Sequence, residues 1–259
     1  MIQRLWARIG RRTRAARLGG GLAVLMMAIV TPLAGFANAR TSVCAATDVR
    51  CVITFGDARI AERQTALTKL NSRVTEMFTD GRITSADNAA LVGDISTNES
   101  GLTALRGQLD SASDAATART DVKLIYTRFR IFAVVLPRDY HDLWLDMLVR
   151  TDTRLATSET VTQDAINGAP AGVQGQANTL FADYKAQVST AQAQTQAAQP
   201  LIAQLTPASF NANPSAYKTT LTTVKTDIQT AHTATRQAIS DLHQIVTLLK
   251  GAAPASPSA

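Results

Sequence analysis

The sequence predicts an all-α protein, folded as an elongated antiparallel helical bundle with coiled-coil-like seams. Apolar residues recur three and four positions apart through most of the chain, which is the spacing of amphipathic helices. No convincing stretch alternates with the period of two that is typical of strands. With 259 residues, of which 46% are hydrophobic, the chain is long enough to bury a real core, and a wholly disordered protein is excluded.

Residues 1–39 are typical of a secretory signal peptide. They contain six arginines and no acidic residue, an apolar stretch from Leu18 to Phe36, and the small-residue cleavage site Ala37-Asn38-Ala39. A retained membrane anchor is the alternative, which the glycines and the proline inside the apolar stretch disfavour. No later stretch approaches the ~20 apolar residues that a membrane span needs. We therefore expect residues 40–259 to be soluble outside the cytoplasm, secreted or in the cell envelope.

The charge of the chain divides at the same point. The sequence carries 26 Lys and Arg against 20 Asp and Glu, a formal net charge of +6. Without the six leader arginines, 20 basic residues balance 20 acidic residues in residues 40–259. A neutral chain argues against nucleic acid as a partner, because binding to phosphates depends on positive charge.

The N-terminal segment 40–56 contains the only two cysteines, Cys44 and Cys51. In an oxidising compartment they are expected to form a disulfide. A redox or metal-binding pair is the alternative, but the spacing is not C-x-x-C and no histidine lies nearby.

The first predicted helix runs from about Asp57 to Thr79. Its apolar face is built from residues that recur with helical spacing: Ile60, Leu67, Leu70, Val74 and Phe78. Asp80-Gly81 ends the helix, because glycine readily adopts the left-handed conformation that follows many helices. Thr84 then begins the next helix, with Asp87 completing a capping-box pattern.

The second predicted helix reaches about Asp110, and Asn98 interrupts its apolar seam. A single buried asparagine often fixes register and partner number in helical assemblies. After a turn at 111–113, a third helix extends to Leu136. Its predicted buried residues are Val122, Ile125, Phe129 and Phe132.

Helical periodicity resumes after Pro137 and fades near Ile166, before the glycine- and proline-rich linker 167–172. Residues 40–166 carry 15 basic and 17 acidic residues, whereas residues 167–259 carry only five and three. We therefore expect a helical module at 57–166, with a kink at Pro137, and a second module at 173–250. A single bundle that reverses direction at Pro137 is the alternative arrangement.

The second module is predicted to begin with a helix from Val173 to at least Gln199. Pro200 should either kink this helix or begin a short last turn through Leu205. Residues 207–213 are expected to form a loop, with Asn213 as the N-cap of the last helix. That helix keeps an unbroken 4-3 apolar spacing to Lys250 and ends at Gly251. The remaining residues, 251–259, form a predicted disordered tail.

The densest apolar region of the chain surrounds Pro137. Its candidate interaction residues are Ile131, Phe132, Val134, Val135, Leu136, Tyr140 and Trp144. A buried junction between the two modules is one interpretation, and an exposed patch for self-association, a partner protein or a lipid is another. A kinked helix could also leave a small apolar pocket.

Three polar patterns in the sequence are candidate sites. Asp139, Asp142 and Asp146 share a helical face near His141, which suggests a metal, but a solvated face with an Asp146–Arg150 ion pair explains them more simply. A calcium loop at Asp80-Gly81 fails because Phe78 occupies a ligand position. A stripe of hydroxyl and amide residues on the last helix suits an uncharged surface or a solvated face: Thr219, Thr223, Thr226, Thr230, Thr233, Gln237, Ser240, Gln244 and Thr247.

Three segments resemble a group of exported helical proteins of bacteria, actinobacterial in type. They are the turn 80–84, the apolar run 132–137, and the segment 205–214 that contains Phe210-Asn211-Ala212-Asn213-Pro214. The resemblance implies export and helical structure, and it implies no activity and no site residues.

The sequence carries no catalytic signature, cofactor motif or metal-ligand motif. It lacks a G-x-S-x-G elbow, a phosphate-binding glycine loop, a cysteine–histidine dyad and a zinc pattern. The prediction is an exported, non-enzymatic structural or protein-interaction bundle without cofactors. The alternative is an extracytoplasmic carrier or sensor that binds a small apolar ligand near Pro137.

Overall fold

The computed structural model describes residues 44–252. Their helices are α3 (Val49–Thr79), α4 (Ser85–Asp110), α5 (Ala115–Leu124), α6 (Leu136–Asn167), α7 (Ala171–Ile202), α8 (Pro207–Ala212) and α9 (Pro214–Gly251), with π-helical segments η3 (Ile125–Phe129) and η4 (Ile131–Val135). Within these residues there is no strand, and the prediction of an all-α helical bundle is confirmed. The predicted signal peptide, residues 1–39, and residues 253–259 of the predicted tail lie outside the described residues.

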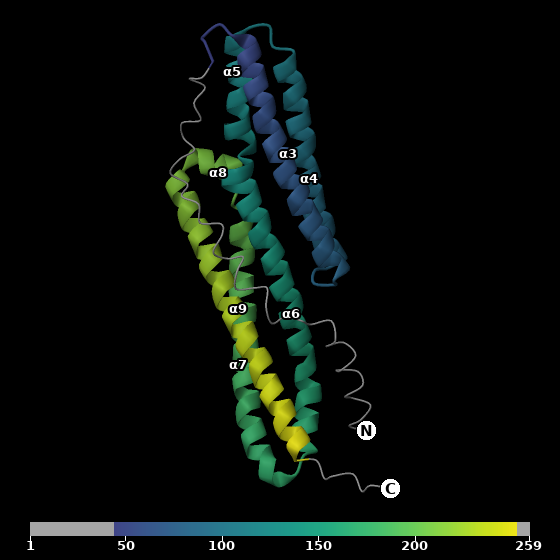
Figure 1. Cartoon of the computed structure of the whole chain (residues 1–259). Helices are drawn as coiled ribbons and strands as arrows, with labels where there is room; N and C mark the ends of the chain where they lie inside the picture. The colour runs from purple at the N-terminus through teal and green to yellow at the C-terminus, as the bar shows by residue number, and fades with distance from the viewer. Residues whose placement is uncertain (1–43, 253–259) are drawn as a thin grey trace. The chain divides into compact units, whose positions relative to one another are not determined.

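The helices form two neighbouring groups of three. Helices α3, α4 and α5 pack against one another, and α6, α7 and α9 do the same (Figure 1). The path from α5 through η3 and η4 into α6 connects the two groups, and α6 also contacts α3 and α4. The predicted division at 167–172 therefore separates α6 from the two helices that it contacts most. A short connection of this kind makes consecutive helices antiparallel neighbours.

The interruption of the connecting helix falls at Arg130 rather than at Pro137, where the kink was predicted. Arg130 lies between η3 and η4 with φ 44° and ψ 40°, in the left-handed region. Pro137 instead lies in the first turn of α6, which follows η4 directly. Sequence could not locate the break, because arginine is not a residue that normally adopts this conformation.

Several helix ends differ from prediction for local reasons. Helix α3 begins at Val49 rather than Asp57, because the Asp48 carboxylate accepts a hydrogen bond from the Cys51 amide (3.0 Å) and caps it earlier. Pro200 lies inside α7. The predicted loop 207–213 contains α8, which a capping box between Thr206 and Ser209 begins.

Other predicted caps are confirmed. Thr84 and Asp87 form both hydrogen bonds of the capping box at α4. Gly81 has φ 66°, the conformation predicted after α3. The Asn213 side chain accepts a hydrogen bond from the Ala216 amide (3.0 Å) at the start of α9.

Two phenylalanines predicted on buried faces are exposed. Phe78 of α3 is 41% exposed, and Met77 is buried in its place. Phe132 of η4 is 42% exposed, although Ile131 beside it is fully buried. A π-helical turn holds more residues than an α-helical one, so the face that each residue presents changes along η3 and η4.

Candidate functional site at the helix junction

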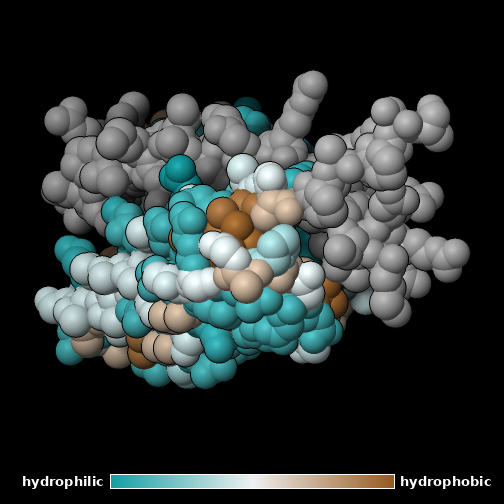
Figure 2. Space-filling model, turned by 90° about the horizontal axis from the view of Figure 1, so that it is seen from below, coloured by the Kyte–Doolittle hydropathy of each residue, from teal (hydrophilic) through white to brown (hydrophobic). Residues whose placement is uncertain are grey.

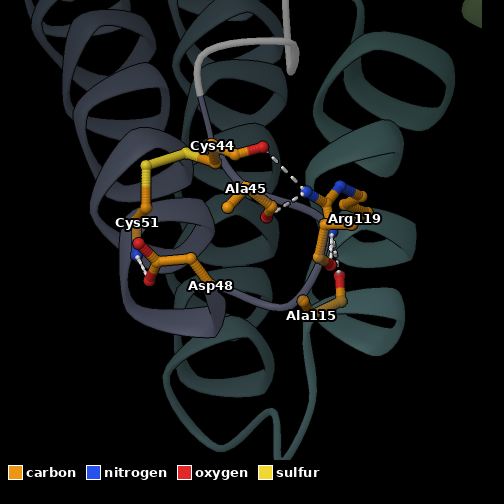
Figure 3. Close-up of a disulfide and its surroundings, with 7 residues drawn as sticks. Cys44, Ala45, Asp48, Cys51, Ala115 and Arg119 are labelled. Atoms are coloured by element: carbon orange, nitrogen blue, oxygen red, sulfur yellow. Dashed lines mark hydrogen bonds between the residues drawn. A yellow bond between two sulfur atoms is a disulfide. The ribbon is translucent and has the colours of Figure 1, made fainter.

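The predicted disulfide between Cys44 and Cys51 is confirmed, and it lies at the N-terminal end of α3 (Figure 3). Arg119 of α5 reaches across to the segment that the disulfide closes. Its guanidinium donates hydrogen bonds to the carbonyl oxygens of Cys44 (3.3 Å), Ala45 (2.9 Å) and Ala46 (2.7 Å). The segment is thus attached to α5 as well as to α3.

The predicted interaction residues around Pro137 divide by exposure. Ile131, Val134 and Val135 are buried, so they belong to the core of the junction. Leu136, Tyr140 and Trp144 are half-buried. Phe132 has the largest exposed fraction of this set. The candidate interaction surface is therefore the part of the surface around Phe132.

A buried arginine holds Phe132 in place. Arg63 of α3 is only 6% exposed, and its guanidinium carbon lies 4.8 Å from the ring centre of Tyr126 and 5.1 Å from that of Phe132. Its Nη1 donates to the Arg59 carbonyl (2.8 Å), and burial lowers the pKa of Arg63. Cation–π contacts of this kind gain strength when the cation is desolvated. Phe132 is therefore exposed yet ordered.

Beside Phe132 lies an open groove along α3, called here the α3 groove, of about 630 Å³. It is lined by Phe132 and by residues of α3: Ala58, Ala61, Glu62, Thr65, Ala66 and Lys69. Short side chains make up most of this lining. One acidic and one basic side chain accompany them.

The break at Arg130 is held by α8. The Arg130 Nε donates to the Asn211 Oδ1 (2.6 Å), and the Asn211 Nδ2 donates to the Thr127 carbonyl (2.7 Å). The Arg130 guanidinium lies 4.3 Å from the ring centre of Phe210, whose ring packs edge-on against Tyr217 of α9 (5.0 Å). Sequence reasoning missed this contact, because it joins residues more than 80 positions apart and no local pattern marks them.

The carboxylates predicted to form a solvated face of α6 lie instead against α4. Asp139 is 2% exposed, and Arg138 bridges it to Asp94 of α4, with 2.7 Å between the Arg138 Nη2 and the Asp139 Oδ1. The Asn98 Nδ2 donates to the Asp94 carboxylate (3.1 Å) and to the Asp94 backbone carbonyl (2.9 Å). Both of these hydrogen bonds lie within α4. Burial raises the pKa of Asp139 to about 7, against the opposing charge of Arg138.

Asp142 and Asp146 continue this face, and the charge of Arg138 opposes the effect of burial on the pKa of Asp142. Burial, with the charges of Asp142 and Asp87, raises the pKa of Asp146 to about 8, and burial also raises the pKa of Asp142. Arg150, the expected ion-pair partner of Asp146, donates instead to the Gly81 carbonyl (2.7 Å). Asp146 therefore binds a proton near neutral pH.

The remaining polar candidates contact backbone carbonyls of their own helices. His141 faces the carbonyl of Pro137 through Nδ1, and burial lowers its pKa. Hydroxyls of the exposed α9 stripe donate to backbone carbonyls four residues back, as Thr219 does at 3.2 Å and Thr226 at 3.0 Å. Among residues 44–252, no three His, Cys, Asp or Glu side chains are grouped so that they could hold a metal ion.

A second open groove of about 590 Å³ runs between α7 and α9 and includes Leu180, Arg236 and His243. Seen from below, the described residues are mostly hydrophilic, with a small hydrophobic group near the middle of the view (Figure 2). No helix of the described chain has the length and apolar character needed to cross a bilayer.

Comparison of the sequence and structure with models of protein families, with curated proteins and with solved structures found no match.

Proposed function

We propose that this protein is an exported, non-enzymatic helical bundle that binds another protein chain through Phe132 and the α3 groove. The observation that carries the proposal is the position of Phe132. This ring is 42% exposed although Ile131, Val134 and Val135 of the same apolar run are buried, and it lines a groove. Exposed aromatic residues beside grooves are frequent anchors of protein interfaces.

The order of Phe132 supports a binding role further. Arg63 stacks on the ring at 5.1 Å, and Arg63 is itself buried and bonded to the α3 backbone. A ring that is already held in place loses little conformational entropy when a partner covers it. Without a partner, the exposed part of the Phe132 ring would only lower the stability of the folded chain, since exposed apolar area is hydrated unfavourably.

Export is supported by the signal-peptide character of residues 1–39 and by the disulfide. The mature chain would then act in the cell envelope or outside the cell, where a disulfide between Cys44 and Cys51 persists. The resemblance of three segments to exported bacterial helical proteins agrees with this location.

The alternative role, a carrier or sensor for a small apolar ligand near Pro137, has less support. Val134 and Val135 are packed in the core there, with at most 1% of their surfaces exposed. Neither the α3 groove nor the groove between α7 and α9 is lined by Pro137, Tyr140 or Trp144.

A photo-crosslinking residue at position 132 tests the proposal. Benzoylphenylalanine replaces Phe132 in one variant of the full-length chain and Phe78 in a control variant, because Phe78 is equally exposed at 41% but does not line the groove. In cells that produce the protein, light should join position 132, and not position 78, to a discrete protein chain. A variant at position 132 that yields no discrete product, or the same products as position 78, would refute the proposal.

A further inference from the structure

The α3 groove has a charge pattern that is complementary to itself. Glu62 and Lys69 are seven residues apart, so they lie on the same side of α3, separated by about 10.5 Å along its axis. Thr65 and Ala66 lie midway between them. If a second α3 lies antiparallel, with a two-fold axis between Thr65 and Ala66, Glu62 of each copy faces Lys69 of the other.

Both charged side chains are accessible for such contacts. The Glu62 side chain is 48% exposed, and its closest cation is the exposed Arg59 (2.7 Å) on the same helix. Lys69 is exposed and makes no ion pair or hydrogen bond with any described residue. An antiparallel copy would therefore supply Lys69 with the counter-charge that it lacks within its own chain.

The rest of the lining suits a close approach of two helices. Ala58, Ala61 and Ala66 carry only methyl groups, and the distance between packed helix axes decreases with the size of the side chains between them. Phe132 lines the same groove, so each copy would add one ring to the contact. A two-fold interface of this kind uses the same surface on both copies and closes on itself.

We infer that the α3 groove binds the α3 groove of a second copy of this chain, antiparallel, with reciprocal Glu62–Lys69 ion pairs. This inference rests on the proposed function, because it names the partner that covers Phe132. The protein is then a dimer whose two copies meet along α3. The C-terminal group of helices in each copy remains available for other contacts.

Charge reversal tests the inference on the chain expressed from its full-length sequence. Sedimentation equilibrium should give a dimer, and Glu62→Lys or Lys69→Glu alone should raise its Kd by about tenfold, because each creates two like-charge contacts. The double variant E62K/K69E restores opposite charges across the axis and should return Kd to within about threefold of the native value. Phe132→Ser should also raise the Kd of the dimer, and it should lower the Tm of the monomer because buried Arg63 loses one of its two stacked rings.

Matched controls carry the same charge changes elsewhere. Asp183→Lys on α7 and Lys218→Glu on α9 alter exposed residues outside the α3 groove and should leave Kd unchanged. A chain that is monomeric up to millimolar concentration overturns the inference, as does a dimer that the double variant does not restore. A product of this chain with a different protein at position 132 overturns the inference alone, and no product at all overturns the proposed function as well.

Discussion

Replacement of Asp152 by asparagine should stabilise the protein above pH 6 and leave its stability almost unchanged near pH 4. Asp152 of α6 is 1% exposed. One carboxylate oxygen accepts a hydrogen bond from the Thr235 hydroxyl of α9 (2.8 Å), and the other has no partner. Burial raises the pKa of Asp152 to about 6, and the hydrogen bond from Thr235 limits the rise. Asparagine keeps the acceptor for Thr235 and cannot ionise.

The size of the effect follows from the two pKa values of Asp152. Below an unfolded-state pKa of 3.8 the carboxyl is protonated in both states, and its ionisation contributes nothing to the free energy of unfolding. Between pH 3.8 and about 6 the unfolded chain releases the proton and the folded chain keeps it, so stability falls as the pH rises. The full loss is about 3 kcal/mol, reached above the folded pKa, and the asparagine variant avoids it.

Urea unfolding of the native and D152N chains at each pH from 4 to 8 measures this difference. Other buried carboxyls, such as Asp139 and Asp146, are present in both chains, so their contributions cancel. Asp183→Asn, an exposed replacement on α7, is the matched control and should give no trend. A difference between D152N and the native chain that does not change from pH 4 to pH 8 would refute the reasoning. So would a variant that is less stable than the native chain at pH 8.

Three further comparisons test the packing, the junction and the disulfide by urea unfolding and by Tm. Gly56→Ala should lower the free energy of unfolding by about 1–3 kcal/mol, because an added Cβ would lie 2.4 Å from a side chain of α4. Gly107→Ala, with nothing within 4 Å of its Cβ, should raise it by up to about 1 kcal/mol. Arg130→Gly should be about 1 kcal/mol more stable than Arg130→Ala, since both lose the guanidinium but only alanine keeps the left-handed strain. Replacing Cys44 and Cys51 together by serine should cost up to about 2.5 kcal/mol and remove the effect of reductant on Tm.

Each of these changes has an outcome that contradicts its reason. Equal effects of alanine at positions 56 and 107 would mean that α3 does not approach α4 closely. Equal stability of the two Arg130 variants would mean that the left-handed conformation is not retained in solution. A native Tm that reductant does not alter would mean that the disulfide contributes nothing to stability.

Local features of the structure were within reach of the sequence. The recurrence of apolar residues predicted the helical class. Thr84 with Asp87, Gly81 and Asn213 predicted helix ends because caps depend on a few neighbouring residues. The disulfide followed from two cysteines and an expected compartment.

The candidate site depended on contacts that the sequence does not encode locally. Phe132 fits the apolar pattern of the sequence as well as Ile131 does. Only the π-helical turns and the position of α3 leave the Phe132 ring exposed and the Ile131 side chain buried. The carboxylates of α6 have the spacing of a solvated face, and α4 buries Asp139 by packing across it.

Sequence by itself therefore determined that this chain is helical, where most helices begin and end, and that two cysteines pair. Tertiary structure alone decided where the connecting helix breaks, which aromatic ring reaches the surface and which carboxyls hold protons. The physical reason is the distance along the sequence between the residues that interact. Helical periodicity and caps arise from residues a few positions apart, whereas exposure, pKa and the Arg130–Asn211 contact depend on segments that only the fold brings together.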